Sequence, residues 1–194
     1  MERKILWSGL IILAVFLGVA LIVSRKSQQK FSGVEILPAP DAPELVGLYS
    51  SDNGSVRLED LRGKVVLLFF GYTNCPDVCP ATVAKLKQVT SRLGESADDV
   101  TVLLVTTDPK RDTPEQLKNY LENFNPAFQG LTGQPSELKM AWDDYGVAVL
   151  DDGTTHSSRV YVIDQEGQLR LTFPYEMTIE DMLSDLKVLI SESQ

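Results

Sequence analysis

The chain has 194 residues, of which 43% are hydrophobic, and a formal net charge of −9. The charge is unevenly distributed, because five of the 18 basic residues but only one of the 27 acidic residues precede residue 31. The remainder is strongly acidic, so phosphate backbones would repel it and we expect no nucleic-acid partner. Its roughly 150 residues are enough for one domain with a core that needs no disulfide for stability.

The amino-terminal segment carries an apolar run. Residues 5–23 contain no charged side chain, and lysines and arginines flank both ends of the run. At ~1.5 Å per residue, a helix over this run is roughly 28 Å long, close to the hydrocarbon thickness of a bilayer. The apolar part of a secretory signal is usually shorter, about 7 to 15 residues. We therefore predict a transmembrane helix over residues 1–24 that remains as an anchor.

The next segment has the composition of a linker. Residues 25–43 begin with polar side chains and contain Pro38, Pro40 and Pro43. Such a sequence is typical of a semi-extended chain, which could reach roughly 60 Å at ~3.1 Å per residue. The sequence thus predicts a tether between the anchor and a folded domain of residues 44–194.

Strand and helix patterns alternate along this domain. Residues 45–49 and 55–58 flank the turn-forming residues 51–54, which predicts a hairpin. Residues 65–72 form an unbroken apolar, β-branched and aromatic run, typical of a central strand buried on both faces. Residues 82–93 then place apolar side chains at helical spacing.

The pattern continues with a second buried strand, predicted over residues 100–106. Thr113, followed by proline and then by glutamine at the third position, is a capping pattern that opens an amphipathic helix through Phe124. A further helix is predicted over residues 135–145 and is stopped by Gly146.

The last elements are a hairpin and a helix. Residues 159–164 and 169–173 are predicted strands joined by the turn at 165–168. Residues 178–190 predict a closing helix with one apolar face. This order of elements predicts an α/β fold of thioredoxin type, in which helices flank a central mixed sheet.

Two cysteines and one histidine carry the chemical signal. Cys75 and Cys79, the only cysteines, follow the predicted strand 65–72, and His156 is the only histidine. Ligands bind beyond the carboxyl ends of strands in open α/β sheets, so this position favours a functional thiol pair over a structural disulfide. Amide donors and the helix dipole there favour the thiolate, which is both a nucleophile and a metal ligand.

The number and spacing of these residues limit which redox reaction or metal ion the site can support. Disulfide oxidoreductases of thioredoxin type place two residues between their cysteines, whereas three intervene here. Structural zinc takes four ligands, one more than this set supplies. Two thiolates and an imidazole suit Cu(I) and can also hold Cu(II). On its own, however, a loop residue such as His156 is typical of a solvated surface, and Asp77, Asp108 and Asp112 are typical of turns and caps.

Separated motifs together carry a resemblance to a known family. They are GYTNCPDVCP at residues 71–80, DPKRDTP at 108–114, and HS at 156–157, which precedes YVID at 161–164 and Gly167. In this order they closely resemble the Sco/SenC family, and the resemblance covers essentially everything after the tether. It implies a membrane-anchored copper-binding protein of thioredoxin-like fold that assists copper insertion into the binuclear copper site of cytochrome c oxidase.

Position by position, the resemblance implies that Cys75, Cys79 and His156 bind one copper ion per monomer, as Cu(I), Cu(II) or both. Asn74 and Thr155 stand where many relatives have a histidine and an acidic residue. We expect a copper chaperone rather than an enzyme, in a bacterial plasma membrane with its domain on the extracytoplasmic side. Its expected partners are the oxidase subunit with the binuclear site and an upstream copper donor or thiol reductant.

Three other functions remain open at this stage. A thiol-disulfide reductase would use Cys75 or Cys79 as the attacking thiolate, keep the cysteines of the oxidase subunit reduced, and need no His156. A peroxidase is disfavoured, because the Thr-x-x-Cys motif of peroxiredoxins is missing. A redox or copper sensor would have its disulfide state read by another protein.

Overall fold

The computed structural model describes residues 31–50, 52, 54–150 and 158–192. The described residues from Ser32 onward belong to one compact unit. The predicted anchor over residues 1–24 lies outside the described residues and stays a prediction. Within the described ranges, no helix has the length and apolarity that crossing a membrane requires.

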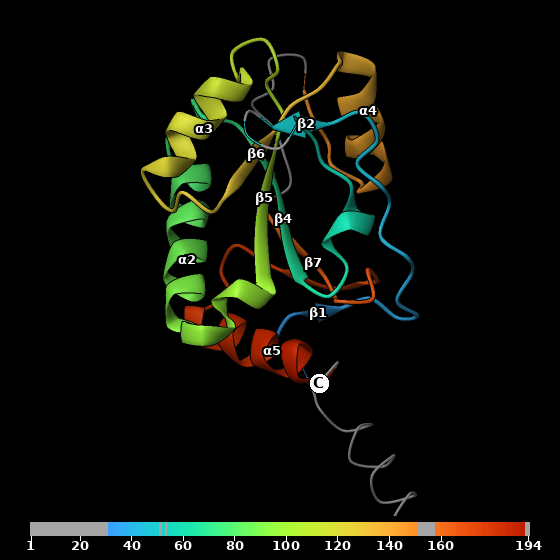
Figure 1. Ribbon diagram of the computed structural model, residues 1–194, viewed down its shortest axis with the longest axis vertical. Helices are drawn as coiled ribbons and strands as arrows, with labels where there is room; N and C mark the ends of the chain where they lie inside the picture. The colour runs from blue at the N-terminus through green and yellow to red at the C-terminus, as the bar shows by residue number, and fades with distance from the viewer. Residues whose placement is uncertain (1–30, 51, 53, 151–157, 193–194) are drawn as a thin grey trace, which may run out of the picture. The chain divides into compact units, whose positions relative to one another are not determined.

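A six-stranded sheet with the order β1-β8-β7-β4-β5-β6 forms the middle layer of this unit (Figure 1). Its strands are β1 (Val34–Glu35), β4 (Val65–Gly71), β5 (Val100–Thr106), β6 (Gln129–Leu131), β7 (Val160–Ile163) and β8 (Leu169–Phe173). The β4-β5-β6 half is parallel, whereas β7, β8 and β1 join by antiparallel pairing. The predicted mixed sheet is thus confirmed.

Strand β4 lies at the centre of the sheet, and all of its residues are buried. Leu68 pairs with Leu103 of β5 on one side and with Tyr161 of β7 on the other. Helices cover both faces, so the strand needs apolar side chains in both directions, which accounts for the unbroken run in the sequence. The predicted central strand is confirmed and ends one residue earlier, at Gly71.

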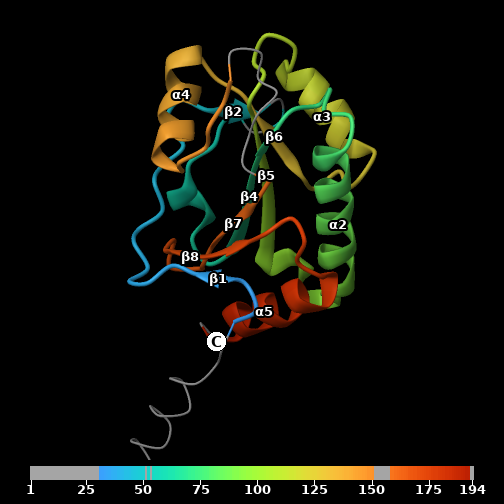
Figure 2. The same ribbon diagram turned by 180° about the vertical axis from the view of Figure 1, so that it is seen from behind.

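Helices flank the sheet on both faces (Figures 1 and 2). One face carries α2 (Val78–Arg92) and α3 (Pro114–Glu122), and α5 (Ile179–Glu192) packs against α2. The other face carries α4 (Pro135–Asp144) and the 3-10 helix η1 (Leu58–Leu61). Between the sheet and α4 lies an apolar cluster that includes Phe70, Val105, Leu131, Leu138 and Ala141.

The helix boundaries follow the capping residues. The Thr113 side chain accepts a hydrogen bond from the Gln116 N–H at 3.2 Å, and α3 begins at the next residue, as predicted. Helix α4 ends before Gly146, whose φ of 63° lies in the left-handed region that favours glycine. A second 3-10 helix, η2 (Gly94–Asp99), leads from α2 into β5.

The predicted hairpin near residue 50 is present but short. Its strands are β2 (Tyr49–Ser50) and β3 (Gly54–Ser55), with Tyr49 opposite Ser55. Residues 58–61, where the second predicted strand ends, instead form the 3-10 turn η1, so the apolar Leu58 is buried without sheet pairing.

Part of the predicted tether belongs to the folded unit instead. Val34 of β1 pairs with Thr172 of β8, and the Ala42 N–H donates to the Gly167 carbonyl at 3.0 Å. The Gly33 N–H donates to the buried carboxylate of Asp185 at 2.8 Å. The prolines suggested a linker because they cannot donate to a sheet, yet residues before and between them supply the required N–H groups.

Candidate functional site

The two cysteines lie at the junction between β4 and α2. Helix α2 begins at Val78, four residues earlier than predicted, so Cys79 is its second residue and Cys75 belongs to the preceding turn. Pro80 occupies the third helical position, where its missing N–H removes no intrahelical hydrogen bond. The central strand and the first turn of α2 thus fix the two sulfur atoms close to one end of the sheet.

The sulfur of Cys79 packs on the end of β4. The residue is 0% exposed, and a Cβ added to Gly71 would lie 2.9 Å from Cys79 Sγ and 2.8 Å from the Phe69 ring. Real Cβ atoms do not approach other atoms so closely, so glycine is needed here to let helix and strand approach. The buried sulfur of Cys79 therefore packs against the backbone of Gly71.

Cys75 has a different environment. It is half-buried, and its Sγ accepts the N–H of Cys79 at 3.4 Å. Burial favours the neutral thiol, but hydrogen bonds from the Asp77 and Cys79 N–H groups and from the Tyr72 hydroxyl favour the thiolate and outweigh it. The pKa of Cys75 therefore lies below its ordinary value, so this thiol is ready to ionise.

The pKa of Cys79 moves in the opposite direction. Burial raises it strongly, and the negative charge of Cys75 and of Asp112 raises it further, against a hydrogen bond from the Tyr72 N–H. Neither cysteine forms a disulfide in the structure. The pair is chemically unequal, with one accessible thiol that ionises readily and one buried thiol that holds its proton.

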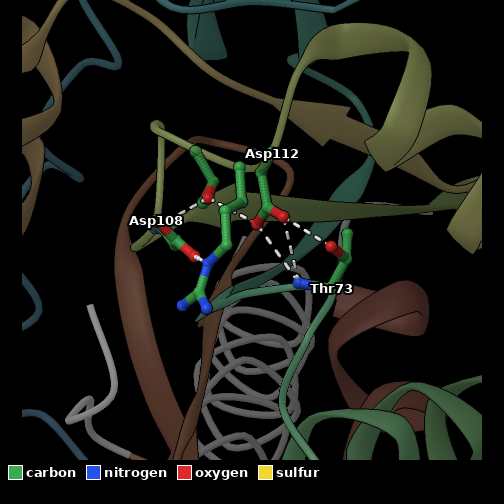
Figure 3. A network of polar contacts seen from close by, with 5 residues as sticks. Thr73, Asp108 and Asp112 are labelled. Carbon is green, nitrogen blue, oxygen red and sulfur yellow. Dashed lines mark hydrogen bonds and ion pairs between the residues drawn. The ribbon is translucent and has the colours of Figure 1, made fainter. Parts of the chain in front are cut away.

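A buried carboxylate ties the cysteine turn to the neighbouring strand (Figure 3). Asp112 is 0% exposed and accepts hydrogen bonds from the Thr73 N–H at 3.1 Å, the Thr73 hydroxyl at 2.5 Å and the Thr106 hydroxyl at 2.7 Å. Thr73 follows β4 and Thr106 ends β5, so one carboxylate fixes the ends of both strands.

Asp108 takes part in the same network of hydrogen bonds. Its N–H donates to the Thr106 hydroxyl at 2.9 Å, its carbonyl accepts the Asp112 N–H at 2.9 Å, and its carboxylate pairs with Arg111. The sequence predicted turn or cap roles for Asp108 and Asp112, and it missed the bridging role of Asp112. That role depends on how the turn after β5 folds back, so that Asp112 reaches Thr106, six residues earlier in the chain.

Asp77 stands at the N-cap of α2, but its side chain makes no capping hydrogen bond. Its contribution to the site comes from its backbone N–H, which faces the Cys75 sulfur. A pocket of about 540 Å³ lies near the site, between residues 107–111 and α4, and neither cysteine lines it. The thiol pair is thus not enclosed in that pocket.

His156 lies outside the described residues, so its predicted place beside the cysteines stays a prediction. In the part of the chain that the structure describes, no group of three or more His, Cys, Asp or Glu side chains could hold a metal ion. The described donors are therefore the two sulfurs. Such a pair fits a soft ion, as it also fits a reversible disulfide.

A mixed sheet with a thiol pair after its central strand places the chain among proteins of thioredoxin-like fold. The SCO1/SenC family model matches residues 41–191. The chain belongs to the SCO1/SenC family, as the motifs in the sequence predicted.

Relatives and solved structures agree with this assignment. A SCO2-like protein of Rickettsia felis is 30% identical over 193 residues, covering 92% of this chain and 94% of the relative. The structure of Bradyrhizobium japonicum ScoI with copper bound is 35% identical, with a TM-score of 0.67, and covers 78% of this chain and 99% of that one.

A further solved structure is that of BsSco, described as a member of the Sco family of cytochrome c oxidase assembly proteins in which a disulfide switch was identified. It is 27% identical with a TM-score of 0.67, and it covers 84% of this chain and 99% of that one.

Proposed function

We propose that this protein is a copper chaperone that binds one copper ion through Cys75, Cys79 and His156 and delivers it to the binuclear copper site of cytochrome c oxidase. The observation that carries the proposal is the pair of cysteines at the end of β4, which form no disulfide and have N–H and hydroxyl donors around the Cys75 sulfur. Copper bound to B. japonicum ScoI supports it, as does the role in oxidase assembly given for the family of BsSco.

The unequal thiols suggest an order of events. Cys75, the readily ionised thiol, binds the incoming copper first. Cys79 then gives up its proton as the second Cu–S bond forms, because metal binding requires the deprotonated sulfur. His156 supplies the third ligand and supports the Cu(II) state. The copper leaves by ligand exchange with the thiolates of the acceptor.

The same proposal includes the location. Residues 1–24 anchor the chain in a bacterial plasma membrane, and the folded unit lies on the extracytoplasmic side. Thiols can become oxidised in that compartment, so a reductant must keep Cys75 and Cys79 reduced before copper is loaded. The upstream partners are therefore a copper donor and a thiol reductant.

Anaerobic titration of the reduced full chain with Cu(I) tests the proposal. We expect one copper per chain and an ultraviolet thiolate-to-copper absorption, both absent from Cys75→Ser and Cys79→Ser. His156→Ala should keep Cu(I) with lower affinity and lose Cu(II). A reduced wild-type chain that binds no copper above background would exclude the chaperone function.

The inequality of the thiols also supports a second candidate, a thiol-disulfide reductase. The Cys75 thiolate would attack a partner disulfide, forming a mixed disulfide and releasing one partner thiolate. Cys79 would then attack Cys75, so that the partner is released with both of its thiols reduced and Cys75 and Cys79 are oxidised to a disulfide. An external dithiol would reduce the pair again. This cycle needs no His156, so intact oxidase assembly by His156→Ala without copper binding would favour it.

A further inference from the structure

The pocket between residues 107–111 and α4 has no part in the copper site as proposed. Its volume of about 540 Å³ lies within the range of ~300 to 1,000 Å³ that ligand-binding pockets occupy. Leu150, at one side of it, is 59% exposed. The apolar side chains that line the pocket include Pro109, Trp142, Val147, Val149 and Leu150. The lining is thus suited to an apolar group of a ligand or partner.

The pocket is held in shape by hydrogen bonds. The Trp142 ring N–H donates to the carbonyl of Thr106, the last residue of β5, at 3.1 Å. The Trp142 carbonyl in turn accepts the Val147 N–H at 2.7 Å. These bonds tie α4 and the residues after it to the sheet, so little conformational entropy has to be lost when the pocket binds a ligand.

The pocket is also connected to the segment that carries the cysteines. Thr107 lines the pocket, and its N–H donates to the Gly71 carbonyl at 2.9 Å. Gly71 is the residue against which the Cys79 sulfur packs. At the other end of the same turn, Asp112 accepts the Thr73 N–H at 3.1 Å. A group bound in the pocket therefore contacts a turn that is hydrogen-bonded to the cysteine segment, and it leaves the sulfurs uncovered.

The charges at the pocket differ from those of the whole chain, whose net charge is −9. The charged side chains among the described lining residues are Lys110, Arg111, Lys139, Asp108 and Asp143. Asp108 is only 5% exposed and pairs with Arg111. The exposed charges are therefore three cations and one carboxylate, that of Asp143, which pairs with Lys139. A negatively charged partner would be attracted here and repelled by most of the remaining surface.

We propose that this pocket is the docking site for the copper acceptor, and that it binds an apolar side chain of the acceptor that is flanked by carboxylates. An apolar centre within a charged rim is the usual organisation of a protein–protein interface, and tryptophan and arginine are frequent in its energetically important positions. Docking beside the thiols leaves both sulfurs open to ligand exchange. The inference rests on the proposed function, which makes the copper-site domain of the oxidase subunit the acceptor.

Calorimetric titration of the copper-free full chain, in detergent micelles, with the copper-free soluble domain of the oxidase subunit tests the inference. Leu150→Glu places a carboxylate in the apolar lining, so we expect Kd to rise at least about tenfold. Met140→Glu is the matched control, because Met140 is 49% exposed on α4 and does not line the pocket. Its Kd should equal that of the wild type.

A second pair of variants tests the charge without changing the apolar lining. Lys110→Glu should raise Kd about threefold at low salt, and about 0.5 M salt should remove the difference. Lys87→Glu makes the same change of charge at an exposed position of α2 outside the pocket, and should leave Kd unchanged. All four variants keep both cysteines, so they should bind copper with the stoichiometry of the wild type.

The outcomes separate docking from copper binding. Equal affinities in Leu150→Glu and Met140→Glu, or a wild-type chain that does not bind the acceptor domain, would overturn the inference even if the chain binds one copper ion. Weaker acceptor binding in Leu150→Glu and Lys110→Glu alone, in a chain that binds no copper, would support docking while excluding the chaperone function. Self-association that only Leu150→Glu abolishes, with acceptor affinity unchanged, would assign the pocket to a second copy of this chain and also overturn the inference.

Discussion

The face of the sheet under α4 and the carboxyl end of β4 are stabilised in different ways. Under α4 the buried side chains are almost all apolar, and Leu68, Phe70 and Leu138 are 0% exposed. At the end of β4 the buried groups are a carboxylate, hydroxyls and a thiol, fixed by hydrogen bonds to Asp112 and by the backbone of Gly71. The first region stabilises the fold by burying apolar surface, an interaction without directional requirements. The second region uses directional hydrogen bonds, which hold the sulfurs in fixed positions.

The largest change in stability should come from the apolar region. Leu138→Ala removes a fully buried side chain, and we expect the free energy of unfolding to fall by ~3 to 4 kcal/mol. Met140→Ala on the same helix is the control, because Met140 is 49% exposed and should cost little. Urea unfolding measures both, and the reaction rates of the thiols in the folded state should be the same in both variants. A change in thiol rates would show that the two regions are coupled.

The second prediction concerns the inequality of the thiols. Because the pKa of Cys75 is lowered and that of Cys79 is raised, iodoacetamide at neutral pH should modify Cys75 at least about 100-fold faster. The rate at Cys75 should rise with pH to a midpoint below the ordinary thiol value of about 8.5. Peptide mapping by mass spectrometry identifies the modified cysteine, and equal labelling of both would contradict the assignment.

The same shifts predict how stability depends on pH. The lowered pKa of Cys75 stabilises the folded state above the unfolded thiol pKa, and this contribution is lost as pH falls through the folded value. The raised pKa of Cys79 stabilises the folded state below the unfolded pKa, and that contribution is lost as pH rises. Cys75→Ser should therefore be more destabilising at pH 9 than at pH 6, whereas Cys79→Ser should show the reverse. Urea unfolding at both pH values measures this.

After Leu138→Ala, the next largest loss of stability should come from the hydrogen-bond network around Asp112. Asp112→Ala leaves the Thr73 N–H and the Thr73 and Thr106 hydroxyls without their acceptor, so we expect a loss of ~2 to 3 kcal/mol in unfolding free energy. Asp77→Ala, which removes a carboxylate that makes no capping bond, should cost much less. If Asp112→Ala loses as little stability as is expected for Asp77→Ala, the network around Asp112 contributes no stability.

The sequence predicted the elements whose local pattern and tertiary role agree. The run that became β4 is buried on both faces, and Thr113 caps α3 as its sequence requires. Strand β1 and the three residues of β6 were missed, because such short strands have no period and form only by pairing with β8 and β5. The start of α2 was placed late because two prolines surround Cys79, although proline is tolerated in a first turn.

For the site, the sequence identified the thiol pair and its position after a central strand. It could not show that the two thiols differ, because the difference arises from burial and from donors supplied by Tyr72 and Asp77. It also gave no indication that Asp112 joins the ends of two strands, since this depends on how the turn after β5 folds back onto the ends of β4 and β5.

The smallest predicted change in stability is that of Gly71→Ala, which tests whether the close approach at Gly71 positions the Cys79 sulfur. Gly71→Ala places a methyl group 2.9 Å from Cys79 Sγ, so helix α2 must shift, at a cost of ~1 to 2 kcal/mol. Gly63→Ala is the control for a glycine with free space, because nothing lies within 4 Å of its added Cβ, although its φ of 83° adds some backbone strain. Only Gly71→Ala should also change the rate at which Cys79 attacks a mixed disulfide on Cys75, because only there does the added methyl displace a sulfur. If both alanine variants lose similar stability and neither changes that rate, the close approach at Gly71 does not position the thiol.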